Sequence, residues 1–174
     1  MKPQIKFIAF IASSIDGRIA KSHYSGTDWT SKEDWNFFQK SLNKMDAVVV
    51  GHNTYKTVVG RLKKRNTLVL TAKIIQPKTK GMVTFFNPRK SDLRRFLQNK
   101  NYKTIAVLGG AQIYDFCLRH GMIDELFVTI EPYVFTTGIP MFAGNKFKKH
   151  NFILKSVKKL NKKGTLLLKY KYEN

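Results

Sequence analysis

The chain has 174 residues, of which 43% are hydrophobic, as expected of one globular domain with a full core. No apolar run approaches the roughly 20 residues of a membrane-spanning helix, which argues against a membrane protein of that type. Lysine and arginine number 32 against 11 aspartate and glutamate, a net charge of +21, but they are scattered over turns and predicted strand ends, which argues against specific nucleic-acid binding.

Cysteine and histidine usage indicates a reduced protein without a metal site. Cys117 is the only cysteine, so an intramolecular disulfide is impossible, which is typical of proteins of the reducing cytoplasm. Its neighbours resemble a helix interior, and we interpret it as a core thiol rather than a nucleophile. The four histidines have no carboxylate or cysteine at ligand spacing, so no metal is expected.

The first half of the chain alternates apolar strands with more polar segments. A nearly continuous apolar run over residues 5–12 predicts a strand buried on both faces, and the mixed stretch over 14–30 predicts a long loop. We expect an amphipathic helix over 31–44 and further buried strands over 46–51 and 67–71. A short helix should follow the glycine that ends the strand over 46–51.

The second half continues this alternation and ends in an antiparallel hairpin. The hairpin should cover residues 152–172 and turn at 161–164. The other segments expected are strands over 83–86, 104–108 and 124–131, a basic helix over 90–99, and a helix from the glycine pair 109–110 to about residue 119. Strands that alternate with helices predict an α/β fold. We therefore expect a single domain over residues 1–174, a three-layer sandwich with a mostly parallel central sheet and the hairpin at its C-terminal end.

Two glycine-containing turns end strands of this predicted sheet. In such folds ligands bind beyond the carboxyl ends of the strands. The loops there cover residues 15–30, 51–54, 71–72 and 109–112. Glycine lets a phosphate approach the backbone, and a helix N-terminus supplies free N–H groups and a positive dipole. Gly51 and the Gly109-Gly110 pair therefore predict a pyrophosphate site, although neither turn matches GxGxxG or a P-loop.

Asp34 and Phe38 are four residues apart near the start of a predicted helix, so they share one face of it. This pair suits a flat, nitrogen-rich heterocycle, because the carboxylate accepts hydrogen bonds from ring N–H groups and the aromatic side chain covers the ring. The alternative is that Asp34 caps its own helix, since Ser31-x-x-Asp34 fits a capping box. Thr30-x-x-Glu33 fits one as well, and if Thr30 is the N-cap then Asp34 is free.

The segments TDWTSKEDWNFF, VVVGHNTYKTV, VLGGAQIYDFCL and DELFVTIEP together resemble dihydrofolate reductase and the related reductase domain of riboflavin synthesis, which share one fold. The resemblance covers nearly the whole chain. It implies that Asp34 binds the pterin, that Trp29 is the tryptophan of a mobile active-site loop, and that Thr129 supports the acid by hydrogen bonding. It assigns the remaining substrate contacts to Phe10, Phe38, Leu62 and Arg65.

The resemblance also implies NADPH as the cofactor, with its pyrophosphate against the two glycine turns. His52 stands where the folate enzymes commonly have an arginine for the 2′-phosphate, and Lys73 is the expected substitute. The cofactor contacts implied are Ala12, Ile19, Gly51, His52, Asn53, Thr54, Thr71, Ala72, Lys73, Leu108, Gly109, Gly110, Ala111, Gln112, Ile113 and Tyr114.

The activity that the resemblance implies is reduction of dihydrofolate to tetrahydrofolate, with hydride transfer to C6 and protonation of N5 of the pterin. The spacing of Trp29 and Asp34 favours this enzyme. The segments SIDGRIA and DEL have the character of the alternative, the phosphoribosylaminouracil reductase of riboflavin synthesis. A non-catalytic, basic nucleic-acid binder is the third interpretation. The protein is expected to be a monomer or a homodimer that acts on a small molecule.

Overall fold

The computed structural model describes residues 4–62 and 64–173 of the chain. Its helices and strands follow one another in the order β1 (Lys6–Ser13), β2 (Arg18–Ala20), α1 (Lys32–Leu42), β3 (Ala47–Gly51), α2 (His52–Leu62), β4 (Thr67–Leu70), β5 (Lys78–Lys80), β6 (Val83–Phe86), α3 (Leu93–Asn99), β7 (Thr104–Val107), α4 (Ala111–Arg119), β8 (Glu125–Ile130), β9 (Ile139–Pro140), β10 (Phe152–Lys159) and β11 (Leu166–Tyr172).

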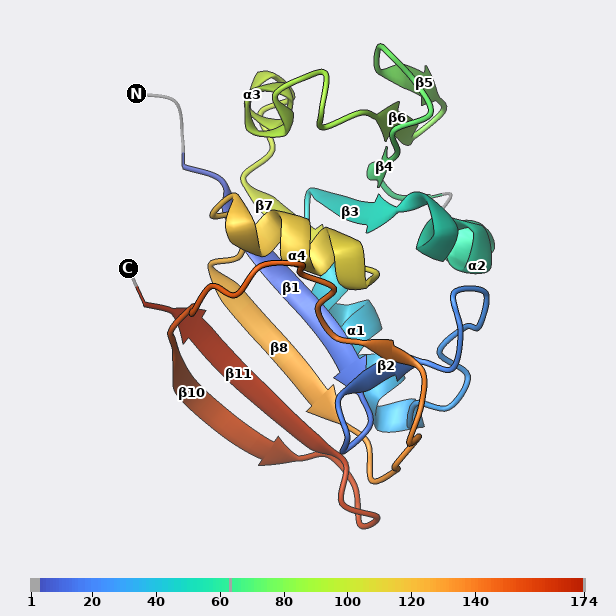
Figure 1. The fold of residues 1–174 in the computed structure, drawn as a ribbon, viewed down its shortest axis with the longest axis vertical. Helices are drawn as coiled ribbons and strands as arrows, with labels where there is room; N and C mark the ends of the chain where they lie inside the picture. Colours follow the sequence, from blue (N-terminus) through green and yellow to red (C-terminus); the bar gives the residue numbers. More distant parts are fainter. Residues whose placement is uncertain (1–3, 63, 174) are drawn as a thin grey trace.

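A nine-stranded sheet in the order β10-β11-β8-β1-β7-β3-β4-β6-β5 forms the centre of the molecule (Figure 1). From β8 to β6 every neighbouring pair in this order is parallel. The hairpin of β10 and β11 joins β8 in antiparallel orientation, and β5 is antiparallel to β6. The predicted mostly parallel sheet with an antiparallel hairpin at its C-terminal end is therefore confirmed.

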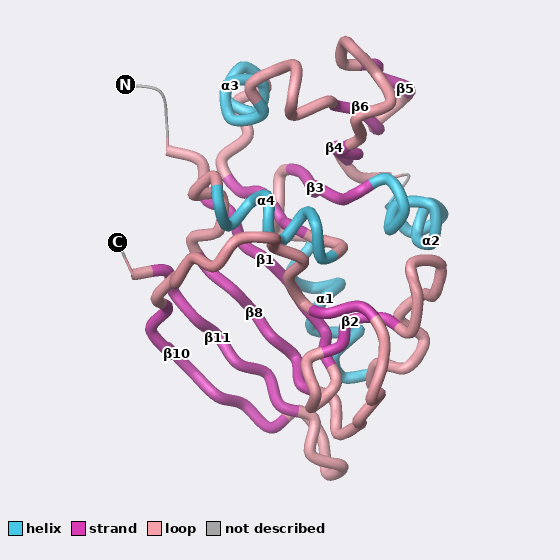
Figure 2. Tube along the Cα trace, in the orientation of Figure 1, coloured by secondary structure: helices cyan, strands magenta, loops and turns pink. Residues whose placement is uncertain are grey.

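Side chains of β1 alternate between two apolar cores, one on each face of the sheet. Phe7, Ala9 and Ile11 belong to the core that includes side chains of α3 and α4. Ile8 and Phe10 belong to the core that includes side chains of α1 and α2. This alternation follows from the two-residue period of a strand. Figure 2 shows α4 in front of the sheet and α1 behind it, so the predicted three layers are present.

Three short strands depart from the prediction. β2 lies inside the stretch over 14–30 that the sequence predicts to be a loop, and it pairs with β9 in a separate two-stranded sheet. β5 pairs with β6, and all of its residues are exposed. These strands are too short to show a hydrophobic period, and each forms only because its partner lies beside it.

Two helices begin at residues other than those predicted. Ser31 is the N-cap of α1, and its Oγ accepts a hydrogen bond of 3.3 Å from the Asp34 N–H, so the interpretation with Thr30 as N-cap is wrong. The basic helix predicted from residue 90 begins only at Leu93, because Asp92 caps α3 by accepting from a backbone N–H in the first turn.

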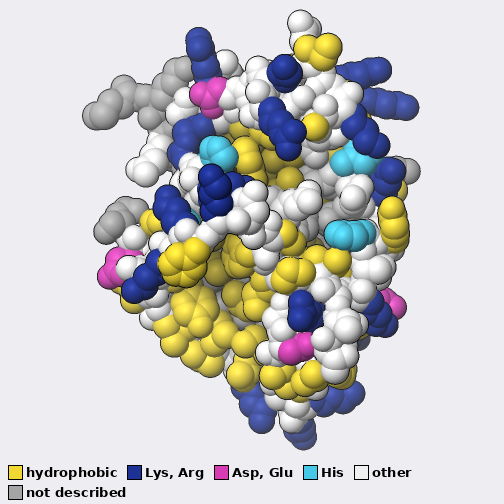
Figure 3. Space-filling view, in the orientation of Figure 1, with side chains coloured by type: hydrophobic (Ala, Val, Ile, Leu, Met, Phe, Trp, Pro, Cys, Tyr) yellow, Lys and Arg dark blue, Asp and Glu magenta, His cyan; other side chains and the backbone are white. Residues whose placement is uncertain are grey.

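Lysines occupy both edges of the nine-stranded sheet. At one edge β10 is exposed over nearly its whole length and is interrupted by a β-bulge between Leu154 and Ser156. It carries Lys155, Lys158 and Lys159. β5, with the sequence KTK, forms the other edge. Figure 3 shows Lys and Arg side chains spread over the visible face rather than gathered in one stripe.

Candidate active site

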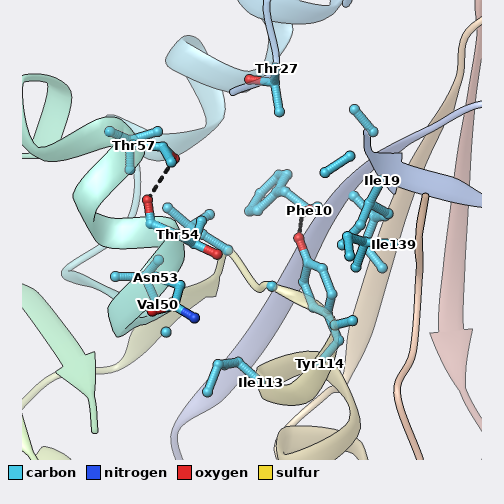
Figure 4. A pocket seen from close by; sticks show the side chains of 18 of the residues that line it. Phe10, Ile19, Thr27, Val50, Asn53, Thr54, Thr57, Ile113, Tyr114 and Ile139 are labelled. Atoms are coloured by element: carbon cyan, nitrogen blue, oxygen red, sulfur yellow. Dashed lines mark hydrogen bonds between the residues drawn. The ribbon is translucent and has the colours of Figure 1, made fainter. Parts of the chain in front are cut away.

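A cavity of about 610 Å³ opens at the carboxyl ends of the central parallel strands, where ligands of such sheets bind. Figure 4 shows its two sides. Thr54 and Thr57 come from α2 on one side, and Phe10, Ile19 and Ile139 from strands on the other. A cavity of this size accommodates a small organic ligand.

Most of the site residues expected from the resemblance line this one cavity. They are Phe10, Ala12, Ile19, Asp34, Phe38, Gly51, His52, Asn53, Thr54, Leu62, Thr71, Ala72, Lys73, Leu108, Gly110, Ala111, Gln112, Ile113, Tyr114 and Thr129. Trp29, Arg65 and Gly109 are not among the lining residues. Segments far apart in the sequence thus meet where the fold predicts a ligand.

The carboxylate of Asp34 is free of the capping role that the sequence leaves open. The Ser31 N–H, which a capping box would direct to Asp34, donates instead to Glu131 Oε1 at 2.6 Å. Helix capping at this end is therefore divided between the Ser31 hydroxyl and a carboxylate from beyond β8. Asp34 is only 8% exposed, and it faces the cavity.

The environment of Asp34 favours its protonated form. Burial raises the pKa of its carboxyl from 3.8 to about 6, and the negative charge of Glu131 acts in the same direction. Hydrogen bonds with Thr129 and Thr30 lower the pKa and offset part of this rise. A carboxyl group with such a pKa gains and loses a proton near neutral pH, as acid–base chemistry requires.

Aromatic side chains form the wall next to Asp34. The Phe10 ring stacks on Phe127 at a centroid distance of 5.4 Å, and Phe38 meets Phe10 edge-on at 5.9 Å. Phe37 packs against the same pair, at 6.3 Å from Phe10 and 5.3 Å from Phe127. An acid set in an aromatic wall can hold a planar heterocycle, because the rings cover its faces while the acid accepts from its edge.

Trp29 does not line the cavity and contacts a neighbouring loop instead. Its ring meets Phe135 edge-on at 4.9 Å. The same two segments are joined by Asp16, whose carboxylate accepts from the N–H groups of Phe135 at 3.0 Å and Thr136 at 2.9 Å. Thr27, from the same loop, does line the cavity. The loop expected from the resemblance is present, but its tryptophan faces a neighbouring loop.

The arginine that reaches the cavity is Arg61, not the expected Arg65. Arg65 Nη2 donates to Asn43 Oδ1 at 2.7 Å and to Gln39 Oε1 at 3.4 Å, which directs its guanidinium toward α1. Arg61 lines the cavity, and its guanidinium lies 4.6 Å from the centre of the Trp35 ring. The sequence signal was ambiguous, because both arginines lie near the end of one helix.

The two glycine turns lie side by side at the cavity floor. The Gly51 N–H donates to the Gly109 carbonyl at 2.7 Å. The Gly109-Gly110 bond is cis, and Gly110 caps α4 without a side-chain hydrogen bond. A Cβ at Gly110 would lie 3.1 Å from Thr54 Oγ1, so glycine keeps this space open. The Tyr114 hydroxyl donates to the Phe10 carbonyl and ties α4 to β1 (Figure 4).

His52 begins α2 and adds a polar group to the same floor. Its Nδ1 is buried and has no hydrogen-bond partner among the described residues. Burial lowers the pKa of the imidazole, and the charges of Lys56 and Lys73 lower it further. His52 is therefore neutral at physiological pH, and Lys73, which lines the cavity, supplies positive charge.

Neither a cluster of metal-binding side chains nor a membrane-spanning helix is found among the described residues. No group of three or more His, Cys, Asp and Glu side chains there is arranged to hold a metal ion. None of the helices between residues 4 and 173, residue 63 apart, combines the length and apolar character needed to cross a bilayer. Burial raises the pKa of Cys117 to about 12, which agrees with a core thiol.

Sequence comparison relates most of the chain to known proteins. The dihydrofolate reductase family model matches residues 7–171. The chain is similar to the uncharacterized protein YwjB of Bacillus subtilis (strain 168), with 29% identity over 145 residues, 79% of this chain and 82% of that protein.

Solved structures with the same architecture include a putative riboflavin biosynthesis protein from Shewanella sp. PV-4, with a TM-score of 0.76, 19% identity, and coverage of 98% of this chain and 100% of that one. Dihydrofolate reductase from Enterococcus faecalis, complexed with NADP(H) and RAB-propyl, has a TM-score of 0.65 and 20% identity and covers 100% of both chains. At these identities the likeness shows the fold and leaves the substrate open.

Proposed function

This chain belongs to the dihydrofolate reductase family, and on that premise we propose that it is an NADPH-dependent reductase whose substrate is dihydrofolate. The observation that carries the proposal is the composition of one cavity. Asp34, an aromatic wall and the turns at Gly51 and Gly110 all line it. We assign the substrate to the side of Asp34 and the cofactor to the side of the two turns. A hydride transfer needs both partners in one enclosure, because the donor and acceptor carbons must come within contact distance.

The residues present fit NADPH. The first turns of α2 and α4 supply backbone N–H groups and the positive ends of two helix dipoles for a pyrophosphate. A Cβ at Gly51 would lie 2.8 Å from Ile113 Cγ1, so this position also requires glycine. The unpartnered His52 Nδ1 offers a hydrogen bond, and Lys73 offers a charge for the 2′-phosphate.

The bound cofactor would supply the hydride, and the protein's contribution is orientation and proton control. Asp34 would accept hydrogen bonds from the amino group and N3 of the pterin, and thereby orient its ring against Phe38. Its raised pKa keeps a proton available in the site near neutral pH. Water would carry the proton to N5. The loop over residues 15–30 would exclude bulk water from the reacting atoms.

The second candidate substrate is the phosphoribosylated pyrimidine of riboflavin synthesis. One observation favours it. Arg65, expected to hold the glutamate of a folate, donates to Asn43 at the end of α1 instead. In this case Arg61 would face the substrate phosphate, since it lines the cavity.

The deciding experiment follows NADPH oxidation by the purified protein with dihydrofolate and, in parallel, with the pyrimidine precursor. We expect turnover of dihydrofolate. Turnover of the pyrimidine alone would reject the folate assignment and establish the second candidate. NADPH binding without turnover of either compound would reject both substrates. The Asp34→Asn variant is the control, because it removes the acid and leaves the cofactor side of the cavity unchanged.

A further inference from the structure

Glu131 is a buried carboxylate outside the cavity, directly after β8. It is 1% exposed, and it does not appear among the lining residues. Buried carboxylates are rare in proteins unless their oxygens are hydrogen-bonded. Here both oxygens are used, Oε1 by the Ser31 N–H at 2.6 Å and Oε2 by the Thr165 hydroxyl at 2.7 Å. Charge-assisted hydrogen bonds of this length are strong.

These contacts join three parts of the fold at one point. The Glu131 N–H donates to the Ser13 carbonyl at the end of β1 at 2.8 Å. The side chain reaches the start of α1 through Ser31, and the start of β11 through Thr165. A carboxylate at a helix N-terminus also interacts favourably with the helix dipole. Glu131 therefore fixes where α1 begins.

The start of α1 is also where Asp34 is attached. The Ser31 N–H donates to Glu131 Oε1, and the Ser31 Oγ accepts a hydrogen bond of 3.3 Å from the Asp34 N–H. A second link runs in parallel. Asn161 Nδ2 donates to Glu33 Oε2 at 3.3 Å and to Thr165 Oγ1 at 2.9 Å. The hairpin turn, Glu131 and the first turn of α1 thus form one hydrogen-bonded unit.

Glu131 also acts on Asp34 through its charge. Among the described residues, Glu131 is the charged group whose negative charge raises the pKa of Asp34. The other charged or titratable side chains that line the same cavity are His23 from the 15–30 loop, His52 and Arg61 from α2, Lys73 from the segment after β4, and Tyr114 from α4. The negative charge of Glu131 therefore contributes to the electrostatic environment of the Asp34 carboxyl group.

We propose that Glu131 is a positioning residue for Asp34, which holds the first turn of α1 in place and keeps a second negative charge beside the acid of the cavity. Its side chain does not line the cavity, so it acts through Ser31 and Asp34. The inference rests on the proposed function in one respect, namely that Asp34 contacts the substrate. The arrangement of Glu131 and Asp34 stands on the contacts described above.

The first test is a titration that needs no substrate. The pKa of Asp34 is measured by carbon NMR of the protein labelled at the aspartate carboxyl carbons, in wild type, Glu131→Gln and Thr165→Val. Asp34→Asn identifies the signal. Glu131→Gln keeps hydrogen-bonding atoms but removes the charge, so the pKa of Asp34 should fall by roughly half a unit or more, as for one nearby charge at an effective dielectric constant of about 20 or above. Thr165→Val keeps the charge and should leave that pKa raised.

An unchanged pKa of Asp34 in folded Glu131→Gln would overturn the proposal, because a merely structural glutamate would alter stability alone. If the wild-type protein shows no NADPH-dependent turnover, the proposed function is rejected, but the result of this titration is unaffected. The two failures are therefore distinguishable.

The second test examines the contact from Ser31 and does not require Glu131→Gln to fold. Ser31 has φ of −68°, a value that proline adopts. Ser31→Ala and Ser31→Pro both lose the capping hydroxyl, but only proline lacks the N–H that Glu131 accepts. Ser31→Pro should therefore unfold at a clearly lower temperature than Ser31→Ala. Equal unfolding temperatures would show that this contact does not hold the helix and would overturn the proposal.

Discussion

At the scale of single residues, the proposed chemical role of Asp34 comes with a cost in the free energy of folding. Its folded pKa of about 6 lies above the ordinary value of 3.8, so the folded protein binds this proton more tightly than the unfolded chain does. Ionised Asp34 therefore destabilises the fold above about pH 6, and the effect vanishes below about pH 4. At 1.36 kcal/mol per pH unit, the difference corresponds to about 3 kcal/mol at neutral pH.

Asp34→Asn should therefore be more stable and less active than wild type. The amide carries no charge to bury and retains oxygen and nitrogen for Thr129 and Thr30. We expect a higher unfolding temperature at neutral pH, an advantage that disappears near pH 4, and a loss of turnover of roughly 100-fold or more. Thermal unfolding monitored by circular dichroism at both pH values checks the first part. A variant that keeps full turnover would contradict the role given to the acid.

Two arginines near the end of α2 provide a matched pair. Arg61 lines the cavity and lies over Trp35, whereas Arg65 donates to Asn43 and Gln39 on α1. Arg61→Gln should raise the KM of a substrate with a carboxylate or phosphate tail by roughly tenfold or more, the size expected of a lost hydrogen bond to a charged group. Arg65→Gln should leave this KM nearly unchanged. The opposite ranking in steady-state kinetics would show that Arg65 leaves α1 to bind the substrate.

At the scale of elements, the entry into α4 depends on one glycine. Gly109 has φ of +83°, and a Cβ there would lie 2.5 Å from Tyr114 Cε2. Tyr114 cannot move away easily, because its hydroxyl is bonded to the Phe10 carbonyl. The turn and the helix therefore constrain each other, and the open floor of the cavity follows from that fit.

Gly109→Ala should lower the free energy of unfolding by about 1–3 kcal/mol and weaken NADPH binding, because the added methyl group displaces the turn. Gly60→Ala is the control. Gly60 lies within α2 with nothing within 4 Å of a new Cβ, so alanine there should stabilise the protein by about 0.5–1 kcal/mol. Chemical denaturation of both variants measures the free energy of unfolding, and titration with NADPH measures the affinity for the cofactor. Equal effects would mean that the space at Gly109 is not restricted.

The elements that the sequence predicts correctly are those whose pattern is local. β1, β3 and β4 are runs of buried apolar residues, and apolar character alone identifies them. β2, β5 and β9 have two or three residues and depend on their partners. Their existence is a property of the folded chain, which no local window contains.

The same division applies to the site. The resemblance to the reductase family predicts that Asp34, Thr54 and Tyr114 belong to the site, and all three line the cavity. It does not identify Glu131, whose hydrogen-bond partner Ser31 is 100 residues away in the sequence. It also assigns the anion contact to Arg65 rather than to Arg61, because the directions of the two side chains cannot be read from the sequence. The direction of Arg65 depends on tertiary contacts such as its hydrogen bond to Asn43.

At the scale of the whole molecule, the excess of 21 positive charges should make stability depend on salt. Raising the ionic strength from about 0.01 M to about 0.15 M shortens the Debye length from about 30 Å to about 8 Å, which screens repulsion between lysines. We expect the unfolding temperature to rise and the affinity for NADPH to fall over this range. Thermal unfolding and cofactor titration at both ionic strengths check this. A falling unfolding temperature would show that attractive pairs dominate.

Part of the positive net charge comes from lysines on the edge strands β10 and β5, where it can act without binding a ligand. An edge strand exposes unpaired N–H and C=O groups, and two such edges per molecule are enough to build an endless fibril by strand addition. The bulge in β10 and the charges on both edge strands oppose that polymerisation. The lysines of the two edge strands thus oppose aggregation through strand pairing. We expect the solubility of the protein to depend on these side chains, which do not line the cavity.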